Sequence, residues 1–238
     1  MSILKSNKLL KKKCNINSII YFSTVDWHGH SSITLFFNNC PFRCCYCYNE
    51  SCIYGKKHTL IKTIKKEIFK SKKYVKSIVF LGGEATIQIE SLIQLALFSK
   101  KNNLLVGLHT NGYYIKNIKK LIKLGIIDKY FVDIKAPFNE KRYRNIINIH
   151  THKKKIIKNI IESIKMIDLS NSELELKTTL FPNIVGTKND IIKISEWIDK
   201  YILFKNKTTF VLQQGIPNNT LDKKLRKKVP YTNSQIKK

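Results

Sequence analysis

The 238-residue sequence contains no apolar run long enough to cross a bilayer. Its longest apolar stretches, such as Ser77–Leu81 and Leu104–Leu108, are strand-sized, whereas a membrane-spanning helix needs about 20 consecutive apolar residues. A secretory signal is also absent, because the basic triplet Lys11–Lys13 leads into the polar segment Cys14–Asn17 instead of an apolar one. We therefore expect a cytoplasmic protein with no membrane partner and with reduced thiols, which favours metal ligation over disulfide pairing.

Acidic residues are scarce: 16 Asp and Glu stand against 44 Lys and Arg, a formal net charge of +28. Such a charge by itself suggests a nucleic-acid partner. However, the lysines are scattered over the whole chain, and no RNA- or DNA-binding motif accompanies them. This distribution favours a solvated basic surface, with a nucleic-acid partner as the alternative.

No internal repeat is present, but strand-like and helix-like segments alternate six times, which predicts parallel strands joined by right-handed crossovers in an α/β sheet or partial barrel. The predicted strands are Ile33–Phe37, Lys76–Leu81, Leu104–Leu108, Tyr130–Ile134, Leu174–Leu180 and Thr209–Gln213. The predicted helices lie near Thr59–Lys72, Ile87–Lys100, Ile115–Leu124, Lys153–Ile167 and Asn189–Tyr201.

The length and the hydrophobic content of 43% suit one domain with a sizeable core. We expect this core domain over residues 23–214. A basic N-terminal extension over residues 1–22 precedes it and ends in a short edge strand at Ile19–Phe22. A basic C-terminal tail over residues 215–238 follows it, because the chain turns polar and lysine-rich there.

Three cysteines follow the first core strand at spacings of four and three residues: Cys40, Cys44 and Cys47. Three thiolates on one short loop can converge on a single metal centre. A four-iron cluster with three protein ligands keeps one iron open for a substrate, whereas structural iron–sulfur sites normally use four cysteines. The spacing thus favours a cluster that binds a ligand at its open iron.

A structural zinc site is the alternative, because Cys52, Cys45 or Cys14 could supply a fourth ligand. Cys45 is adjacent to Cys44, so we expect its side chain to diverge from the metal centre. The loop residues His28 and His30 have no neighbours that complete a tetrahedral set, and we expect them to be ordinary loop histidines.

Polar residues also follow the next three predicted strands. They are Gly82, Gly83 and Glu84 after the second, Thr110 and Asn111 after the third, and Asp133 and Lys135 at the end of the fourth. In α/β barrels and open parallel sheets, ligands bind at the carboxyl ends of the strands. The four loops therefore predict one shared pocket.

Gly82 and Gly83 remove side chains where a ligand could approach the backbone closely. Glu84 could accept hydrogen bonds from a ligand ammonium group, or it could be a first-turn carboxylate favoured by the helix dipole. Tyr46 is placed to lay its ring beside an adenine, or to pack within the loop.

Thr110 and Asn111 suit a ribose or a carboxylate, or equally a turn before Gly112. Asp133 and Lys135 point the same way from an alternating strand. If they face an interior, they are costly unless they pair with each other or with a ligand.

With these residues assembled, the chain resembles the radical S-adenosylmethionine (radical SAM) superfamily, and more narrowly the anaerobic ribonucleoside-triphosphate reductase-activating protein family. The likeness runs from about Ser23 to Gln214 and includes the cysteine loop, Gly-Gly-Glu, Thr-Asn-Gly and Val132–Lys135. The chain departs from the family at three positions. The family usually has proline where His28 and Ala85 stand, and commonly histidine where Tyr48 stands.

The resemblance implies a partial (β/α)6 TIM-like barrel with a 4Fe-4S cluster on Cys40, Cys44 and Cys47 that binds SAM through its open iron. It also implies that Gly82, Gly83 and Glu84 hold the methionyl amine. The adenine, ribose and carboxylate of SAM would be positioned by Tyr46, Thr110, Asn111, Asp133 and Lys135.

The implied activity is that of an oxidoreductase. An electron from a donor such as flavodoxin or ferredoxin cleaves SAM to methionine and a 5′-deoxyadenosyl radical, which takes hydrogen from a glycine of a partner glycyl-radical enzyme. Two alternatives stay open at this point. One is a radical SAM enzyme that modifies RNA or a small molecule, and the other is a non-catalytic zinc-binding module.

Overall fold

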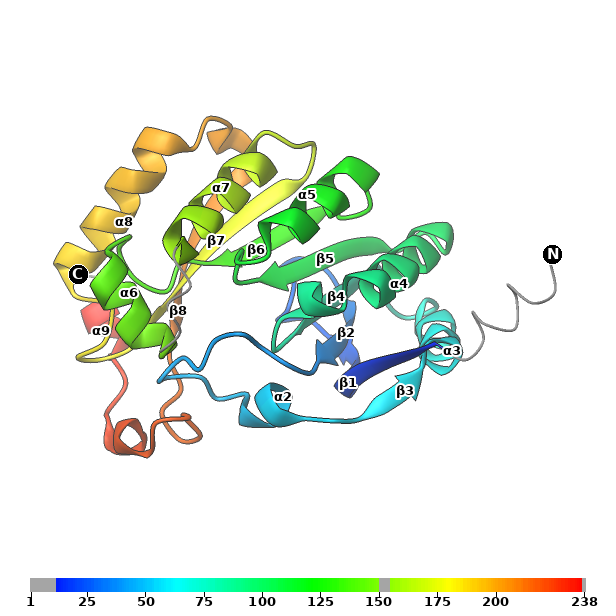
Figure 1. Ribbon diagram of the computed structural model, residues 1–238, viewed down its shortest axis with the longest axis horizontal. Helices are drawn as coiled ribbons and strands as arrows, with labels where there is room; N and C mark the ends of the chain where they lie inside the picture. The colour runs from blue at the N-terminus through cyan, green and yellow to red at the C-terminus, as the bar shows by residue number, and fades with distance from the viewer. Residues whose placement is uncertain (1–11, 150–154, 237–238) are drawn as a thin grey trace. The chain divides into compact units, whose positions relative to one another are not determined.

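The structure, a computed structural model, describes residues 12–149 and 155–236 (Figure 1). Parts of three predicted segments lie outside these residues: 1–11 of the N-terminal extension, 153–154 of the fourth helix and 237–238 of the tail. The chain divides into two compact units. Unit 1 comprises the chain up to Cys40 together with Ser51–Thr110 and Lys116–Tyr130, and unit 2 comprises Pro41–Glu50, Asn111–Ile115 and Phe131–Lys238.

Unit 1 is built on strands in the order β3-β1-β2-β4-β5. Their bounds are β1 Lys13–Ser23, β2 Ser32–Phe37, β3 His58–Leu60, β4 Ser77–Gly82 and β5 Leu105–Thr110. Strands β2, β4 and β5 are parallel, with Leu35 opposite Phe80 and Phe80 opposite Leu108. Strand β1 is antiparallel to both β2 and β3. The carboxyl ends of the parallel strands therefore share one edge, where Cys40 and Glu84 follow.

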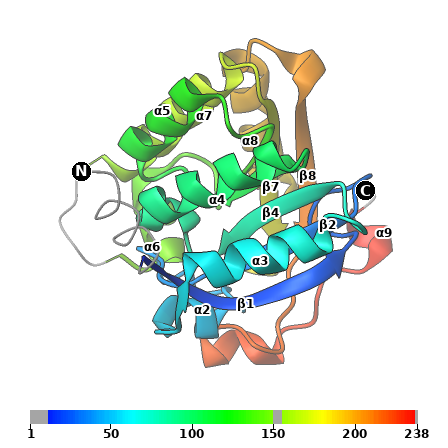
Figure 2. The same ribbon diagram turned by 90° about the vertical axis from the view of Figure 1, so that its right-hand side faces the viewer.

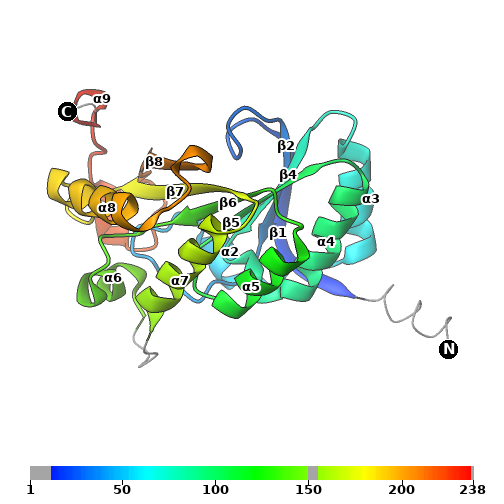
Figure 3. The ribbon, with the colours of Figure 1, turned by 90° about the horizontal axis from the view of Figure 1, so that it is seen from above.

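Helices cover one face of this sheet. They are α3 (Ile61–Ser71), η1 (Ala85–Gln88), α4 (Ile89–Lys101) and α5 (Ile115–Leu124), and the short α2 (Glu50–Tyr54) follows the cysteine loop. Figure 2 shows α3 and α4 side by side, and Figure 3 shows both on the same side of β4. Helix α3 buries Ile61, Ile64 and Ile68. This helical spacing places the apolar side chains on one face of the helix and the lysines on the opposite face.

Unit 2 contains strands in the order β6-β7-β8: β6 (Lys129–Asp133, which begins in unit 1), β7 (Glu173–Leu180) and β8 (Thr208–Gln214). Strands β7 and β8 are parallel and pair from Leu174 opposite Thr208 to Leu180 opposite Gln214. The longer helices of this unit are α6 (Glu140–Ile147), α7 (Ile156–Asp168) and α8 (Lys188–Tyr201). It also contains the short 3-10 helices η2 (Lys205–Lys207) and η3 (Lys223–Lys227) and the short α-helix α9 (Asn233–Ile236).

An ion pair between a partly exposed arginine and a buried aspartate ties α6 to the start of α8. Thr187 and Asp190 form a capping box at the first turn of α8, which satisfies backbone N–H groups that have no partner within the helix. Arg142 on α6 donates to both carboxylate oxygens of Asp190, with Nη2 2.8 Å from Oδ2, and also to the carbonyl of Ile184. Arg142 thus links α6 to the first turn of α8, so the position of α6 depends on this ion pair.

All six predicted core strands are present as β2 and β4–β8, and the predicted helices correspond to α3, α4, α5, α7 and α8. Two predictions are wrong in extent. The expected short edge strand is an eleven-residue strand that begins at Lys13, so residues 13–22 of the predicted extension belong to the sheet. The expected helix start at Thr59 is instead strand β3, because His58–Leu60 pairs with β1, and this tertiary pairing outweighs local helical periodicity.

Among the described residues, three α-helices have no counterpart among the predicted elements: α2, α6 and the four-residue α9. Helix α6 is eight residues long and begins at Asn139, whose side-chain oxygen accepts from Arg142 N–H. In the described part of the chain, no helix is both long and apolar enough to span a bilayer.

Candidate cofactor site

The stem that leads to Cys40 is held by backbone contacts within unit 1. Asn39 has a φ of 72°, a left-handed conformation that asparagine tolerates better than most residues. Its N–H donates to the carbonyl of Cys52 at 2.7 Å, and its own carbonyl accepts from Glu84 N–H at 2.8 Å. The residue that precedes Cys40 is thus tied to the loop after β4.

Gly82 and Gly83 permit this close approach. A Cβ on Gly82 would lie 2.4 Å from the carbonyl oxygen of Phe37, and a Cβ on Gly83 would lie 2.2 Å from that of Asn39. Gly82 also has a φ of +116°, which side-chain-bearing residues rarely adopt. The two glycines are therefore required by the protein's own backbone, whatever ligand approaches them.

Glu84 lies in a buried network of hydroxyl groups. Its side chain is almost fully enclosed, with 1% exposed. Its Oε1 accepts hydrogen bonds from the backbone N–H of Thr86 at 3.2 Å, from the hydroxyl of Thr86, and from the hydroxyl of Thr110 at 2.8 Å. These bonds cap η1 and compensate for burying a carboxylate. The structure thereby brings two predicted site residues, Glu84 and Thr110, into direct contact.

A second polar network, formed by Asn15, Asn38 and Gln88, holds the segment that precedes Cys40. Gln88 on η1 accepts from the N–H of Asn15 at 2.8 Å and donates to the carbonyls of Asn15 and Asn38 at 2.8 and 3.2 Å. The Asn38 side chain donates to the Asn15 side chain at 2.8 Å. Strand β1, the end of β2 and the turn after Glu84 are thus joined through side chains.

Cys44 and Cys47 lie at the two ends of a tight turn in unit 2. The N–H of Cys47 donates to the carbonyl of Cys44 at 2.9 Å, the bond of a β-turn, which keeps the end Cα atoms within about 7 Å of each other. Cys45 and Tyr46 are the corner residues. The cysteine pair is therefore brought together by local backbone folding.

Segments from elsewhere in unit 2 hold this turn on both sides. On one side, the N–H groups of Arg43 and Cys45 donate to the last carbonyls of α6, those of Ile147 and Ile146, at 2.8 and 2.9 Å. On the other side, the N–H groups of Leu221 and Asp222 donate to the carbonyls of Cys47 and Cys45, at 2.7 and 2.9 Å.

None of the six cysteines, all of which lie in the described part of the chain, forms a disulfide. Burial raises the pKa of the Cys45 thiol to about 11 and also raises the pKa of Cys47. Metal binding requires the thiolate, so ligation at Cys47 releases a proton.

Within residues 12–149 and 155–236, no group of three or more His, Cys, Asp or Glu side chains is arranged to hold a single metal ion. A single zinc ion brings its sulfur ligands to within about 4 Å of one another, because each Zn–S bond is about 2.3 Å long. In an iron–sulfur cluster, each thiolate instead binds a different iron. Cys40, Cys44 and Cys47 stand in one short segment, and Cys44 and Cys47 lie at the ends of one turn, so the chemistry of this donor set suits an iron–sulfur cluster with one open iron.

The remaining predicted residues of unit 2 are placed as follows. The ring of Tyr46 is buried and stacks on Phe181, with 6.1 Å between centroids and 14° between planes; burial raises the pKa of its hydroxyl well above the usual value. Asn111 forms a turn, because its Oδ1 accepts from the N–H of Tyr113 at 3.0 Å.

Asp133 and Lys135 form an ion pair of 3.0 Å between Oδ2 and Nζ. Burial is the largest single effect on the pKa of Lys135 and lowers it, but the charge of Asp133 together with Cys44, Tyr46 and Tyr143 raises the pKa well above its usual value, so the ammonium form is strongly favoured. Lys135 is mostly enclosed, with 12% of its side chain exposed, whereas Asp133 is 42% exposed. Of the two arrangements expected for Asp133 and Lys135, pairing with each other or with a ligand, the structure shows the first, and Asp133 remains accessible to solvent.

Four residues that contact the predicted site residues or the cysteine turn were not themselves predicted: Thr86, Asn39, Leu221 and Asp222. Thr86 stands in the same loop as Glu84, and an N-cap pattern could have indicated it. Leu221 and Asp222 bind the cysteine turn through backbone N–H groups, and backbone groups leave no signal in the sequence.

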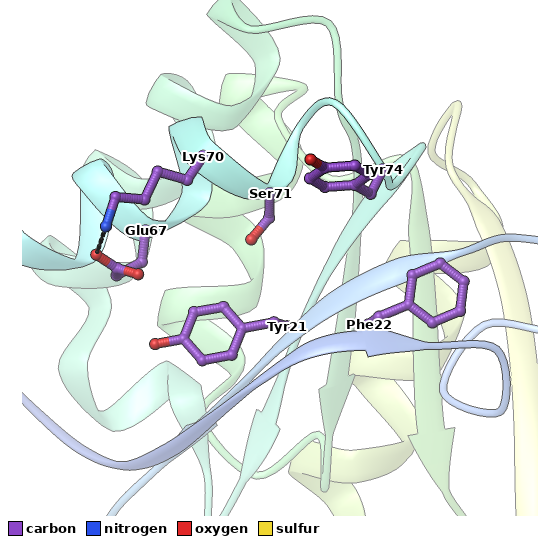
Figure 4. Close-up of a pocket in the computed structure, with 6 residues that line it drawn as sticks. All are labelled: Tyr21, Phe22, Glu67, Lys70, Ser71 and Tyr74. Atoms are coloured by element: carbon purple, nitrogen blue, oxygen red, sulfur yellow. Dashed lines mark hydrogen bonds and ion pairs between the residues drawn. The ribbon is translucent and has the colours of Figure 1, made fainter.

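A cavity of about 500 Å³ lies elsewhere in unit 1, between β1 and α3 (Figure 4). It is lined by Tyr21, Phe22, Glu67, Lys70, Ser71 and Tyr74. Because β1 runs antiparallel to β2, with Ser23 opposite Ser32, this cavity is near the amino ends of the parallel strands. It contains none of the predicted site residues.

A family model described as the radical SAM superfamily matches residues 34–198. The chain belongs to the radical SAM superfamily. The match lies within the predicted core, residues 23–214, and includes the three cysteines, the Gly-Gly-Glu loop and the Asp133–Lys135 pair.

Two curated relatives extend over most of the chain. It is 27% identical over 217 residues to MJ1227 of Methanocaldococcus jannaschii, provisionally named a glycyl-radical enzyme activating enzyme; the alignment covers 90% of this chain and 85% of that protein. It is 24% identical to the pyruvate formate-lyase-activating enzyme of Streptococcus mutans, over 77% of this chain and 71% of that protein.

Solved structures share the fold at low identity. The enzyme anSMEcpe with bound AdoMet and a peptide has a TM-score of 0.52 at 16% identity, over 75% of this chain and 49% of that one. TsrM from Kitasatospora setae with cobalamin and a [4Fe-4S] cluster has a TM-score of 0.54 at 11% identity, over 80% of this chain and 38% of that one. This chain therefore spans less than half of either structure.

These matches confirm the predicted superfamily and an α/β fold that fits a partial TIM-like barrel. They also confirm the predicted cofactors at the level of the family, SAM and a 4Fe-4S cluster. The protein is accordingly an enzyme of the radical SAM type.

Proposed function

We propose that this radical SAM enzyme installs a glycyl radical on a partner enzyme of the anaerobic ribonucleotide reductase type. The observation that carries the proposal is the relative MJ1227, named for glycyl-radical enzyme activation, which aligns with 90% of the chain. The reductase-type partner is favoured by the resemblance of Ser23–Asp26, the cysteine loop with Tyr48-Asn49, and Val132–Lys135 to that activating family.

In this proposal Cys40, Cys44 and Cys47 hold the 4Fe-4S cluster. When bound, the cluster would supply one-electron chemistry: an electron from a donor such as flavodoxin or ferredoxin would cleave SAM to methionine and a 5′-deoxyadenosyl radical, which would take hydrogen from the partner's glycine. The protein contributes the three thiolates, the orientation of SAM and the exclusion of water. The Cys44–Cys47 turn supports this assignment, because its backbone bond keeps two of the donors together before any metal binds.

The residues proposed for SAM are those at the strand ends. Glu84 would accept from the methionyl ammonium beside Gly82 and Gly83, and its carboxylate is already oriented by the hydroxyls of Thr86 and Thr110. The partly exposed carboxylate of Asp133 and the enclosed ammonium of Lys135 offer charge of both signs. These two residues would position the ribose and carboxylate of SAM together with Thr110, Asn111 and Tyr46.

The decisive experiment compares two adjacent cysteines. After anaerobic reconstitution, Cys44→Ala should lose the cluster iron and sulfide and all SAM cleavage, because one of three thiolates is missing. Cys45→Ala is the matched control and should keep both, since Cys45 is a corner residue of the same turn. Full iron content and activity in Cys44→Ala, or colourless protein with zinc and no sulfide, would contradict the proposed cluster.

Glu84→Ala separates SAM binding from cluster assembly. Loss of a charge-assisted hydrogen bond should weaken SAM affinity by at least about tenfold, while the iron content stays normal. Glu90→Ala on the exposed start of α4 is the control, because its carboxylate is paired with Lys120 at the surface. An unchanged SAM affinity in Glu84→Ala would leave this residue only its role as the cap of η1.

The partner is tested by electron paramagnetic resonance. The reduced enzyme, SAM and a glycyl-radical enzyme should produce a stable protein radical, lost when the partner's glycine is replaced by alanine. If SAM cleavage depends instead on added tRNA and falls steeply with salt concentration, the RNA-modifying alternative replaces this proposal.

A further inference from the structure

The chain after β8 returns to the cysteine turn of unit 2 (orange to red in Figure 1). Leu221 and Asp222 donate their backbone N–H groups to the carbonyls of Cys47 and Cys45, at 2.7 and 2.9 Å. The turn that carries Cys44 and Cys47 is therefore hydrogen-bonded to an irregular segment from the C-terminal part of the chain.

This C-terminal segment, Pro217–Leu225, is itself fixed in place. Thr220 is fully buried, and its hydroxyl lies 3.1 Å from the carbonyl of Pro217 and 3.0 Å from that of Asp222. Arg226 Nε donates to the carbonyl of Thr220 at 3.0 Å, and the side chain of Leu225 is buried. A segment with such internal bonds can hold another segment, whereas a solvated tail cannot.

Helix α6 holds the opposite side of the same turn. The carbonyls of Ile146 and Ile147, which would be unsatisfied at the end of the helix, accept from Cys45 and Arg43. The N–H of Cys45 thus donates to α6, and its carbonyl accepts from the C-terminal segment, so both backbone polar groups of Cys45 are hydrogen-bonded.

We propose that Pro217–Leu225 is a positioning strap, which forms the Cys44–Cys47 turn before the cluster binds and slows the loss of the cluster afterwards. The proposal rests on the proposed function for the cluster itself. Its physical basis is preorganisation: a turn that is already ordered pays less conformational entropy when its thiolates bind iron. Asp222 and Leu221 are positioning residues here, because they act through the backbone of the ligand turn.

Because the contact is made by backbone N–H groups, proline is the sharpest probe. Asp222 has a φ of −78°, within the range that proline imposes, so Asp222→Pro removes the N–H with little change in chain direction. Asp222→Ala keeps the N–H but loses the side chain that caps Lys224 N–H at 2.9 Å. The difference between these two variants isolates the bond to Cys45.

Lys223→Pro is the control for proline itself. Lys223 is the first residue of η3, where proline is tolerated, and Asp222 before it is extended with a ψ of 109°. Thr220→Val is a second, milder variant that keeps the side-chain volume and removes the hydroxyl contacts within the strap.

The first measurement uses metal-free protein, so it does not depend on the proposed chemistry. Hydrogen exchange of peptides that cover residues 41–50 should be about fivefold faster in Asp222→Pro than in Asp222→Ala or Lys223→Pro, the effect of one lost hydrogen bond on local opening. Thr220→Val should show a smaller increase in the same peptides. Equal exchange in Asp222→Pro and Asp222→Ala, or no increase in Thr220→Val, would overturn the strap.

The second measurement uses reconstituted protein under anaerobic conditions. Loss of the cluster's visible absorbance to an iron chelator should be several-fold faster in Asp222→Pro than in Asp222→Ala. Identical loss rates would limit the strap to the metal-free protein and overturn its second role. If wild-type protein takes up no cluster, the proposed function fails, whereas the exchange result still decides whether the strap holds the turn.

Discussion

The stem of Cys40 and the turn of Cys44–Cys47 belong to one short motif, yet they are held in different ways. The stem lies in unit 1 against the glycine loop after β4, where Gly83 allows a backbone approach that any side chain would block. The turn lies in unit 2, where four backbone hydrogen bonds come from α6 and from the C-terminal strap. A close backbone approach together with hydrogen bonds therefore fixes one end of the motif, whereas hydrogen bonds from two distant segments fix the other.

The largest expected effect is on the packed side. Gly83→Ala should lower the free energy of unfolding of the metal-free protein by about 3 kcal/mol, because the new Cβ overlaps the carbonyl of Asn39 and the backbone must move. Gly125→Ala is the control: its φ is +59°, but no atom lies within 4 Å of the added Cβ, so it should cost only about 1 kcal/mol of conformational strain. Denaturant unfolding measures both, and equal losses would show that the close approach does not hold the stem.

The hydrogen-bonded side is tested through the helix that supplies its acceptors. Arg142→Ala should lower the free energy of unfolding by about 2 kcal/mol, because it removes charge-assisted bonds from Asp190, whose side chain is 1% exposed. It should also speed hydrogen exchange in residues 41–50, since α6 carries Ile146 and Ile147. Lys120→Ala, which breaks the exposed pair with Glu90, should change stability by about 0.5 kcal/mol or less. Unchanged hydrogen exchange in Arg142→Ala would show that the position of α6 does not hold the Cys44–Cys47 turn.

Acid should weaken the same ion pair. Burial raises the pKa of Asp190, but the hydrogen bonds from Arg142, Thr187 and Gly186 and the positive charge of Arg142 together lower it more, so the pKa lies below its ordinary value of 3.8. A carboxylate with a depressed pKa stabilises the fold fully above the unfolded value and loses this contribution as pH falls through the folded value. The stability difference between wild type and Arg142→Ala should therefore be constant above about pH 5 and shrink below pH 3.8. A constant difference down to the acid transition would contradict this assignment.

The smallest effect concerns the hydroxyl network of Glu84. Thr110→Val should lower the free energy of unfolding by about 1.5 kcal/mol, because the hydroxyl donates to a buried carboxylate. Thr178→Val is the matched control, since Thr178 is equally buried but donates to the neutral carbonyl of Ile134 at 2.9 Å, and it should cost about 1 kcal/mol. Thermal unfolding of the two metal-free variants ranks them. A smaller loss for Thr110→Val would show that this hydroxyl contributes little to orienting Glu84.

Much of this architecture could be predicted because its signals are local. Apolar runs such as Ser77–Gly82 and the helical stripe of α3 specify strand and helix from neighbouring residues alone. The extent of β1 and the presence of β3 could not be predicted in this way, because each strand is completed by pairing with a segment distant in sequence. The sequence indicates the glycines of the Gly-Gly-Glu loop, but not that the backbone of Phe37 requires Gly82 and that of Asn39 requires Gly83.

The sequence by itself determined the order of the elements, the spacing of the three cysteines proposed as ligands and the polar residues that follow the strands, since periodicity and spacing are properties of adjacent residues. Only the tertiary structure decided what holds these cysteines in place. The partners of the cysteine turn, Ile146, Ile147, Leu221 and Asp222, contribute backbone groups that every sequence carries. Which of these groups meet depends on how distant segments pack, and no local pattern of side chains encodes it.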